Sequence, residues 1–249
     1  MVQWTATGYA RAVPVRVPWG FLLLALSGAP ALAQSPAAAP PAGIPITELP
    51  AAAAGDTLAV IYSGDGGWRD LDKQIGELLV REGIPVVGID CLRYFWRARH
   101  PKGLARDLRR ILTHYGAVWG THRVLLVGYS FGADVLPFIV NRLPPEARHE
   151  VVQISLLGLG SRASFEFHVT DWLRTKPRPG DLPVLPEAAK LDQERVQCFY
   201  GSDEEDSLCP ELGRRGAEVV GTTGGHHFDG DYAALARRIR EGLTRRAAR

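Results

Sequence analysis

The sequence predicts an α/β fold, in which a mostly parallel central sheet is covered by helices on both faces. Short runs rich in leucine and β-branched residues alternate along the chain with longer segments whose apolar residues recur at helical spacing. These short runs are apolar along their whole length, as expected for strands that are buried on both faces. Strands that alternate with helices in this way indicate a mostly parallel sheet between two helical layers.

Each expected element comes from one such segment. The strands are expected at 58–62, 84–89, 123–127, 151–157, 195–200 and 217–220. The helices are expected at about 70–82, 102–115, 133–143 and 231–244. A chain of 249 residues suffices for one domain with a substantial core, and at most two. Loops that follow parallel strands meet along one edge of the sheet, where α/β proteins bind ligands.

The composition is that of an ordinary globular protein, with 46% hydrophobic and 22% charged residues. The formal net charge is +2, and no basic block with interleaved aromatic residues is long enough to follow a phosphate backbone. Nucleic acid is therefore not an expected partner.

The N-terminal segment predicts export. Arg11 and Arg16 precede an apolar run at 19–26 that is too short to span a bilayer comfortably. Ala-Leu-Ala at 31–33 then supplies a small-residue cleavage site. We therefore expect residues 1–33 to be a signal peptide and the mature protein to be periplasmic. An anchor that is not cleaved is the alternative.

An Ala/Pro-rich linker is expected at 34–56, and its proline-rich part at 34–50 should carry no packed structure. The folded domain is then expected at 57–249.

The cysteines fit an oxidising compartment. Cys198 and Cys209 lie in one segment and could close a short loop as a disulfide, which would leave Cys91 free. No metal site is expected, because the chain contains no C-x-x-C pair and the adjacent histidines 226–227 lack helical ligand spacing.

A candidate nucleophile lies between a buried strand and a helix. Gly-Tyr-Ser-Phe-Gly at 128–132 matches G-x-S-x-G, directly after the strand at 123–127. Glycines two residues either side of Ser130 remove the Cβ atoms that would collide in so sharp a turn. The turn should place the Ser130 hydroxyl at the edge of the sheet, near a helix N-terminus that stabilises developing negative charge.

A serine needs a base to accept its proton, and this type of fold supplies its acid and its histidine later in the chain. The last strand is followed by Gly-Gly-His-His-Phe-Asp-Gly-Asp at 224–231. We predict His226 as the base, since it follows the paired glycines, and His227 is the alternate.

The acid of the triad should follow the strand that ends at Tyr200. The loop there offers four carboxylates: Asp203, Glu204, Glu205 and Asp206. Asp206 is preferred, because Asp-Ser-Leu-Cys-Pro at 206–210 resembles the D-x-x-V-P pattern that often follows this strand in hydrolases. Glu204, three residues after Gly201, and Asp203 are alternates. A Cys198–Cys209 bridge would hold this acidic loop in place.

Acyl transfer also needs donors for a tetrahedral oxyanion. The backbone N–H of Phe131 is one expected donor, and Gly64 or Asp65, in the glycine-rich turn after the first strand, supplies the other. A phosphate cradle is the competing interpretation of this turn. It lacks both the lysine of G-x-x-x-x-G-K-[ST] and the spacing of G-x-G-x-x-G.

Four blocks of the sequence, taken together, resemble a known family. They are Ile-Tyr-Ser-Gly-Asp-Gly-Gly-Trp-Arg-Asp-Leu-Asp at 61–72, Gly-Ile-Asp-Cys-Leu-Arg-Tyr-Phe-Trp at 88–96, Gly-Tyr-Ser-Phe-Gly-Ala-Asp-Val at 128–135 and Gly-Gly-His-His-Phe-Asp-Gly-Asp-Tyr at 224–232. This pattern is similar to the VirJ/AcvB bacterial virulence proteins, from about Thr57 to the C-terminal helix. AcvB-type members carry an additional N-terminal copy, whereas this sequence is expected to contain one hydrolase-sized domain, and Cys91 stands where a serine is expected.

The resemblance implies an exported α/β-hydrolase with a minimal lid that needs no cofactor. It also implies hydrolysis of aminoacylated phosphatidylglycerol, chiefly the lysyl ester, at the membrane surface, and a link to components of type IV secretion. Ser130 matches the nucleophile of the family.

The residues permit a physical account of such a substrate. Asp65, Asp70 and the spare carboxylates of the acidic loop could receive its amines, with Trp68 beside them. The basic and aromatic stretch at 93–99 could hold the phosphate and touch the membrane interface; its candidate binding residues are Arg93, Tyr94, Trp96 and Arg97. Alternatively, the aromatic residues of this stretch form a core wedge and its arginines are solvated.

Two other functions remain open at this point. One is a binding or chaperone-like periplasmic module on a hydrolase scaffold, which needs no activated serine. The other is a generic esterase or thioesterase, which shares the machinery and differs in the shape of its pocket.

Overall fold

The computed structural model describes residues 39–167 and 180–247. The expected signal peptide at 1–33 lies outside these residues. Among the described residues, none of the helices is both long enough and apolar enough to span a bilayer.

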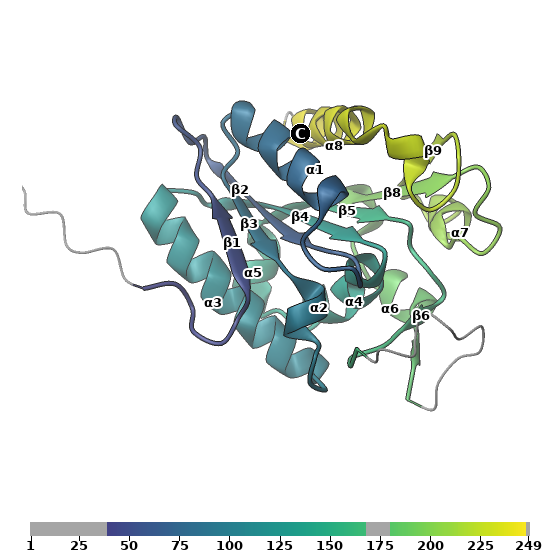
Figure 1. Cartoon of the computed structure of the whole chain (residues 1–249), viewed down its shortest axis with the longest axis horizontal. Coiled ribbons are helices and arrows are strands. Elements are labelled where there is room, and N and C mark those ends of the chain that lie inside the picture. Colours follow the sequence, from purple (N-terminus) through teal and green to yellow (C-terminus); the bar gives the residue numbers. More distant parts are fainter. Residues whose placement is uncertain (1–38, 168–179, 248–249) are drawn as a thin grey trace, which may run out of the picture. The chain divides into compact units, whose positions relative to one another are not determined.

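A seven-stranded sheet forms the centre of the domain, in the order β1-β3-β2-β4-β5-β8-β9 (Figure 1). Its strands are β1 (Ile46–Leu49), β2 (Thr57–Tyr62), β3 (Val86–Ile89), β4 (Arg123–Tyr129), β5 (Val151–Leu157), β8 (Val196–Gly201) and β9 (Glu218–Thr222). All neighbours pair in parallel except β1, which runs antiparallel to β3. The predicted mostly parallel sheet is confirmed.

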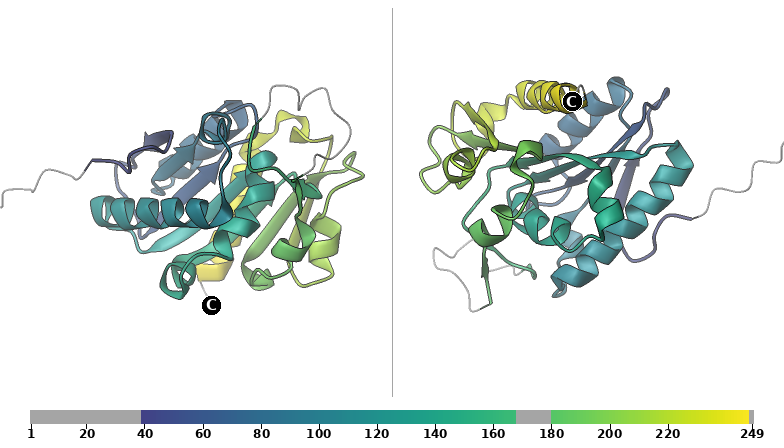
Figure 2. Two further views of the ribbon diagram at one scale, coloured as in Figure 1. Left: turned by 90° about the horizontal axis from the view of Figure 1, so that it is seen from below. Right: turned by 180° about the vertical axis from the view of Figure 1, so that it is seen from behind.

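Helices cover both faces of this sheet (Figures 1 and 2). The main helices are α1 (Asp70–Arg81), α3 (Pro101–Trp119), α4 (Phe131–Val140) and α8 (Tyr232–Ala247). The shorter ones are α2 (Cys91–Tyr94), α5 (Pro145–Glu150), α6 (Leu185–Ala188) and α7 (Cys209–Gly213). Along β2, Leu58, Val60 and Tyr62 pack on the face of α3 and α4, whereas Ala59 and Ile61 pack on the face of α1 and α8. This explains why the strand is apolar at every position.

The segment between β5 and β8 is the longest connection between neighbouring strands on that side of the sheet, and it is the place to look for a lid. Its described part contains a two-stranded ribbon, β6 (Arg162–Ala163) with β7 (Leu182–Pro183), the helix α6 and a short 3₁₀ turn. So far as it is described, this segment fits the minimal lid that was expected.

The expected linker contains a strand, which corrects the prediction of no packed structure at 34–50. Ile46 to Leu49 pair with β3 in the register Ile46↔Ile89. In addition, the hydroxyl of Tyr115 donates to Glu48 Oε1 at 2.6 Å. Prolines on either side obscured this strand, because proline is typical both of linkers and of the ends of edge strands.

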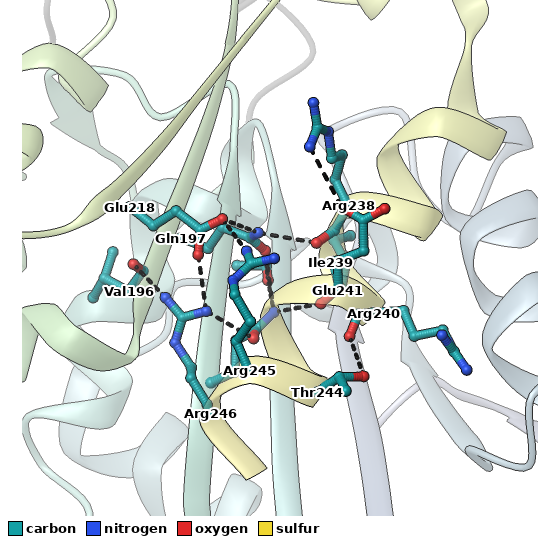
Figure 3. Close-up of polar contacts among 12 residues, drawn as sticks. Val196, Gln197, Glu218, Arg238, Ile239, Arg240, Glu241, Thr244, Arg245 and Arg246 are labelled. Atoms are coloured by element: carbon teal, nitrogen blue, oxygen red, sulfur yellow. Dashed lines mark hydrogen bonds and ion pairs between the residues drawn. The ribbon is translucent and has the colours of Figure 1, made fainter. Parts of the chain in front are cut away.

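A buried polar layer fixes α8 against the sheet (Figure 3). Gln153 and Gln197, on neighbouring strands, are fully buried and joined by a 3.1 Å hydrogen bond. Arg246 of α8 donates to Gln153 Oε1 at 3.2 Å and to Glu218 Oε2 at 3.0 Å. A Cβ atom at Gly242 would lie 2.8 Å from Gln197 Nε2, so the glycine makes room for this layer. The layer therefore holds the helix that follows the histidine loop.

Candidate active site

Ser130 adopts a strained backbone conformation at the junction of β4 and α4. Its φ is 52° and its ψ is −117°, in a region that residues other than glycine rarely occupy. The Ser130 N–H donates to the carbonyl of Leu157 on β5 at 2.8 Å, and its own carbonyl accepts from Asp134 N at 3.0 Å. These hydrogen bonds hold the serine at the carboxyl end of β4, as the sequence predicts.

The two glycines of the elbow are required by close contacts. A Cβ atom on Gly128 would lie 2.7 Å from Ala133 N, inside the turn itself. A Cβ atom on Gly132 would overlap the carbonyl of Tyr62 and lie 2.7 Å from that of Ser63. The first turn of α4 can therefore pack directly on the end of β2, which brings the loop after β2 beside Ser130.

His226 bridges Ser130 and an acidic side chain. Its Nε2 lies 2.7 Å from Ser130 Oγ, and its Nδ1 lies 2.5 Å from Glu204 Oε1. Gly158, with a φ of +64°, lies so close that a Cβ atom there would be 2.7 Å from His226 Cε1. The His226 side chain remains 42% exposed, so the imidazole can be reached from solvent.

His227, the alternate base, faces a different partner. Its Nδ1 lies 2.8 Å from the hydroxyl of Tyr129, which also donates to the His226 carbonyl at 3.3 Å. Burial, followed by nearby charged groups, raises the pKa of Tyr129 well above its ordinary value, so the phenol stays protonated. Tyr129 and His227 thus fix the histidine loop, and His226 alone of the pair meets the serine.

The acidic partner of His226 is Glu204, which corrects the preference for Asp206. Gly201 N–H donates to Glu204 Oε2 at 2.8 Å, and Glu204 N–H donates to the Gly201 carbonyl at 3.0 Å. This tight turn directs the half-buried carboxylate of Glu204 towards His226. Asp206 lies two residues further along and is exposed.

The remaining carboxylates of the loop are also exposed. The alternate Asp203 accepts a hydrogen bond from the adjacent Ser202 hydroxyl at 3.1 Å and does not face the histidine. Glu205 is solvated. The D-x-x-V-P likeness therefore misplaced the acid by two residues.

The expected disulfide is present. Cys198 of β8 and Cys209 at the start of α7 are joined, with a Cα–Cα distance of 5.3 Å, and Cys91 is free and buried. The bridge closes the loop that contains Glu204. The loop is also attached to the chain after β5, because Leu208 N–H donates to the carbonyl of Leu159 at 3.1 Å.

Removing the Cys198–Cys209 disulfide should destabilise the protein and free the loop that contains Glu204. For a closed loop of this size, with a sequence separation of 11 residues, we expect Cys198→Ala/Cys209→Ala to lower the free energy of unfolding by about 3 kcal/mol. Urea unfolding with and without reductant measures this change. Reductant should destabilise the wild type to the same degree and have no further effect on the double variant. An equal effect of reductant on both proteins would contradict this origin of the stability.

Two of the residues expected to supply oxyanion donors, Phe131 and Gly64, lie beside the serine. Phe131 is the first residue of α4, so its N–H lies outside the helical hydrogen-bond ladder. A Cβ atom on Gly64 would lie 3.6 Å from the Cβ of Ser130. The turn is held from below by the hydroxyl of Ser63, which accepts from Cys91 N at 2.9 Å and donates to the Gly64 carbonyl at 3.1 Å.

Two of the predicted substrate-binding residues, Trp68 and Tyr94, pack against other parts of the fold. A Cβ atom on Gly88 would overlap the indole of Trp68, so this side chain lies flat on β3. Tyr94 is buried, and its hydroxyl donates to Asp107 Oδ2 at 2.6 Å. The core-wedge alternative is thus correct for Tyr94, as it is for the buried Phe95.

The other predicted binding residues have side chains that solvent reaches. Arg93, Trp96 and Arg97 are exposed. Asp65 is half-buried, and its negative charge contributes to a raised pKa at two neighbouring groups, Tyr129 and Asp134. It follows Gly64 in the turn that lies beside Ser130. Asp70 is exposed at the start of α1.

Asp134, four residues after the serine, is a structural residue of the site that was not predicted from the sequence. Its Oδ1 accepts from Gly160 N at 2.7 Å, which ties the elbow helix to the loop that backs His226. Burial and, to a smaller extent, the charge of Asp65 raise the pKa of Asp134 well above its usual range. Asp134 belongs to the block at 128–135 that carries the family resemblance, and this was the only indication of its role in the sequence.

Within 39–167 and 180–247, no three histidine, cysteine or acidic side chains are grouped so that they could hold a metal ion.

The fold and the strand order define an α/β-hydrolase, and solved structures agree. Est1E from Butyrivibrio proteoclasticus superposes with a TM-score of 0.57 at 11% identity, covering 82% of this chain and 93% of that one. An esterase from Exiguobacterium antarcticum superposes with a TM-score of 0.56 at 10% identity, covering 80% of this chain and 94% of that one. Proline iminopeptidase from Mycobacterium smegmatis superposes with a TM-score of 0.54 at 14% identity, covering 82% of this chain and 96% of that one.

Residues 56–247 match the family model for bacterial virulence protein (VirJ), and the chain belongs to this family. A search of the curated proteins gave no match. The resemblance seen in the sequence is thereby confirmed.

Proposed function

We propose that the protein is a serine hydrolase that cleaves a carboxylic ester. The observation that supports this most strongly is the continuous chain of short contacts from Glu204 through His226 to Ser130. The serine at its end has the strained backbone of a nucleophile elbow. A scaffold with no catalytic role would have no need to maintain both features.

The proposed reaction uses these groups in two steps. Ser130 Oγ attacks the ester carbonyl while His226 Nε2 takes its proton, and Glu204 stabilises the imidazolium through Nδ1–H. The N–H of Phe131, with Gly64 or Asp65, receives the oxyanion. Collapse expels the alcohol, which takes the proton from His226. Water, deprotonated by His226, then attacks the acyl-serine; the bond from the acyl carbon to Ser130 Oγ breaks, the acid leaves, and His226 returns the proton to Ser130 Oγ.

We propose aminoacylated phosphatidylglycerol, chiefly its lysyl ester, as the substrate. Membership of the VirJ family supports this choice. The carboxylate of Asp65, which follows Gly64 in the turn beside Ser130, is suited to an ammonium group on the acyl part. With an exported protein, the lipid would be met at the periplasmic face of the inner membrane. Components of a secretion apparatus are the proposed protein partners.

The test is hydrolysis of lysyl- and alanyl-phosphatidylglycerol by the wild type and by Ser130→Ala, followed by release of the free amino acid. We expect release by the wild type and a loss of about 10⁶-fold in the variant. A simple acyl ester is assayed in parallel. Cleavage of that ester without cleavage of either lipid would point to a generic esterase or thioesterase. Cleavage of none would favour a binding module.

A further inference from the structure

One surface of the domain is strongly basic although the chain as a whole is not. Residues 91–119, which form α2, α3 and their connection, contain seven arginine and lysine residues and a single carboxylate, Asp107. The whole chain has a formal net charge of only +2. Figure 1 shows α2 beside the beginning of α3, at the edge of the sheet formed by β1 and β3. We call five exposed residues of this segment the α2–α3 surface: Arg93, Trp96, Arg97, Lys102 and Arg106.

A large aromatic side chain stands in the middle of these cations. Trp96 is 59% exposed, more than any other large hydrophobic residue that the structure describes. Its ring stacks on Phe167 with centroids 6.0 Å apart and an interplanar angle of 24°. The indole is therefore supported from one side and presented to solvent on the other. An indole among cations is typical of surfaces that meet the headgroup region of a bilayer.

Arg93 and Arg97, which lie on either side of Trp96 in the sequence, have no acidic partner among the described residues. Neither Arg93 nor Arg97 forms an ion pair with a residue in the described part of the chain, whereas Arg110, on the same segment, pairs with Asp107 at 3.1 Å. Together with Trp96 they line a surface depression of about 470 Å³. The depression thus offers unpaired guanidinium groups, which suit the phosphate of a phospholipid.

The α2–α3 surface is close to the nucleophile. Phe95, which precedes Trp96, is fully buried, and its ring meets that of Phe131 edge to face at 4.8 Å. Phe131 follows Ser130 directly. One aromatic layer therefore separates the exposed indole from the elbow, so a bilayer against this surface would lie beside the site.

We propose that the α2–α3 surface docks the protein on an anionic phospholipid bilayer, with Trp96 in the headgroup region and Arg93 and Arg97 on lipid phosphates. The inference rests on the proposed function only for the identity of the lipid that is cleaved after docking. Each lysine or arginine near an anionic surface contributes about fivefold in binding, so several together suffice for reversible attachment.

The test uses the full chain and sedimentation with vesicles, either of phosphatidylcholine alone or with an equal part of phosphatidylglycerol. The wild type should bind the anionic vesicles at least about tenfold more tightly than the neutral ones, and added salt should weaken this binding. Arg93→Glu/Arg97→Glu should lose at least about tenfold in binding, and Trp96→Ala should lose binding without a change in net charge.

The matched control is Lys73→Glu/Arg81→Glu, which makes the same charge change on the exposed side of α1, on the opposite face of the sheet. It should bind as the wild type does. Because all variants keep the N-terminal segment, any binding through that segment cancels in the comparison. Equal binding by the two double variants would overturn the inference. Wild-type protein that binds anionic vesicles no more tightly than neutral ones would also overturn it. An acidic protein would then be the expected partner of this surface.

Hydrolysis separates this inference from the proposed function. The ratio of cleavage in vesicles to cleavage of a water-soluble ester should fall at least about tenfold in Arg93→Glu/Arg97→Glu. Selective binding to anionic vesicles without any ester cleavage would sink the proposed function and leave the docking surface intact. Cleavage with no lipid preference in binding would do the reverse.

Discussion

Glu204→Gln should lower kcat for ester hydrolysis by about 10³- to 10⁴-fold, whereas Asp206→Asn should leave it near the wild-type value. Glutamine keeps the shape of the side chain and its hydrogen bond with Gly201 N–H. It removes the charge that stabilises the imidazolium, and it can hold His226 in the wrong tautomer. Asp206 is exposed and lies outside this chain of contacts.

The measurement is steady-state hydrolysis of a soluble ester by both variants, with urea unfolding to show that each is folded. The matched change at Asp206 controls for the loss of one negative charge from the same loop. A large loss in Asp206→Asn together with an active Glu204→Gln would show that the loop rearranges and that the assignment to Glu204 is wrong.

The second large effect concerns stability. Asp72→Asn should stabilise the protein progressively as the pH rises, by up to about 4 kcal/mol more at pH 8 than at pH 4. Asp72 is 1% exposed, and burial raises its pKa to about 7. Its Oδ2 accepts from Arg69 N at 3.3 Å, but its Oδ1 has no hydrogen-bond partner among the described residues.

The raised pKa of Asp72 determines whether the wild type gains or loses stability as the pH rises. Near pH 4 the folded protein keeps this proton, and the unfolded chain begins to lose it around its ordinary value of 3.8. Between about pH 4 and pH 7 the wild type therefore loses stability, and above pH 7 the loss is complete. Asparagine has no proton to lose, so its advantage grows over the same interval.

Urea unfolding at pH 4 and pH 8 measures the difference between the two proteins, in which any packing change independent of pH cancels. Asp70→Asn, two residues earlier and exposed, is the control and should show little pH-dependent change relative to the wild type. A difference between Asp72→Asn and the wild type that is the same at both pH values would show that the pKa of Asp72 is not raised in the folded protein.

The sheet and the elbow could be predicted because they depend on short-range patterns. Apolar runs such as 123–127 indicate strands buried on both faces, and glycines around Ser130 indicate a turn that has no room for Cβ atoms. The catalytic histidine could also be predicted, since it follows the last strand of the sheet. These features need no knowledge of how distant loops fold.

The acidic residue that pairs with His226 could not be predicted in this way. Glu204 is selected over its neighbours by a turn on Gly201, a residue whose Cβ atom would overlap the carbonyls of Gly224 and Gly225. That contact joins two loops that are far apart in sequence. Trp68 illustrates the same limit, because its partner Gly88 lies on another strand and a glycine gives no sign that an indole covers it.

Labelling with a fluorophosphonate probe, followed by mass spectrometry, tests most directly whether Ser130 is an activated nucleophile. We expect a single modified peptide with the label on Ser130, no label in Ser130→Ala, and labelling of His226→Ala slowed by orders of magnitude. A folded wild type that does not react, or equal labelling of Ser130→Ala, would contradict this role of Ser130.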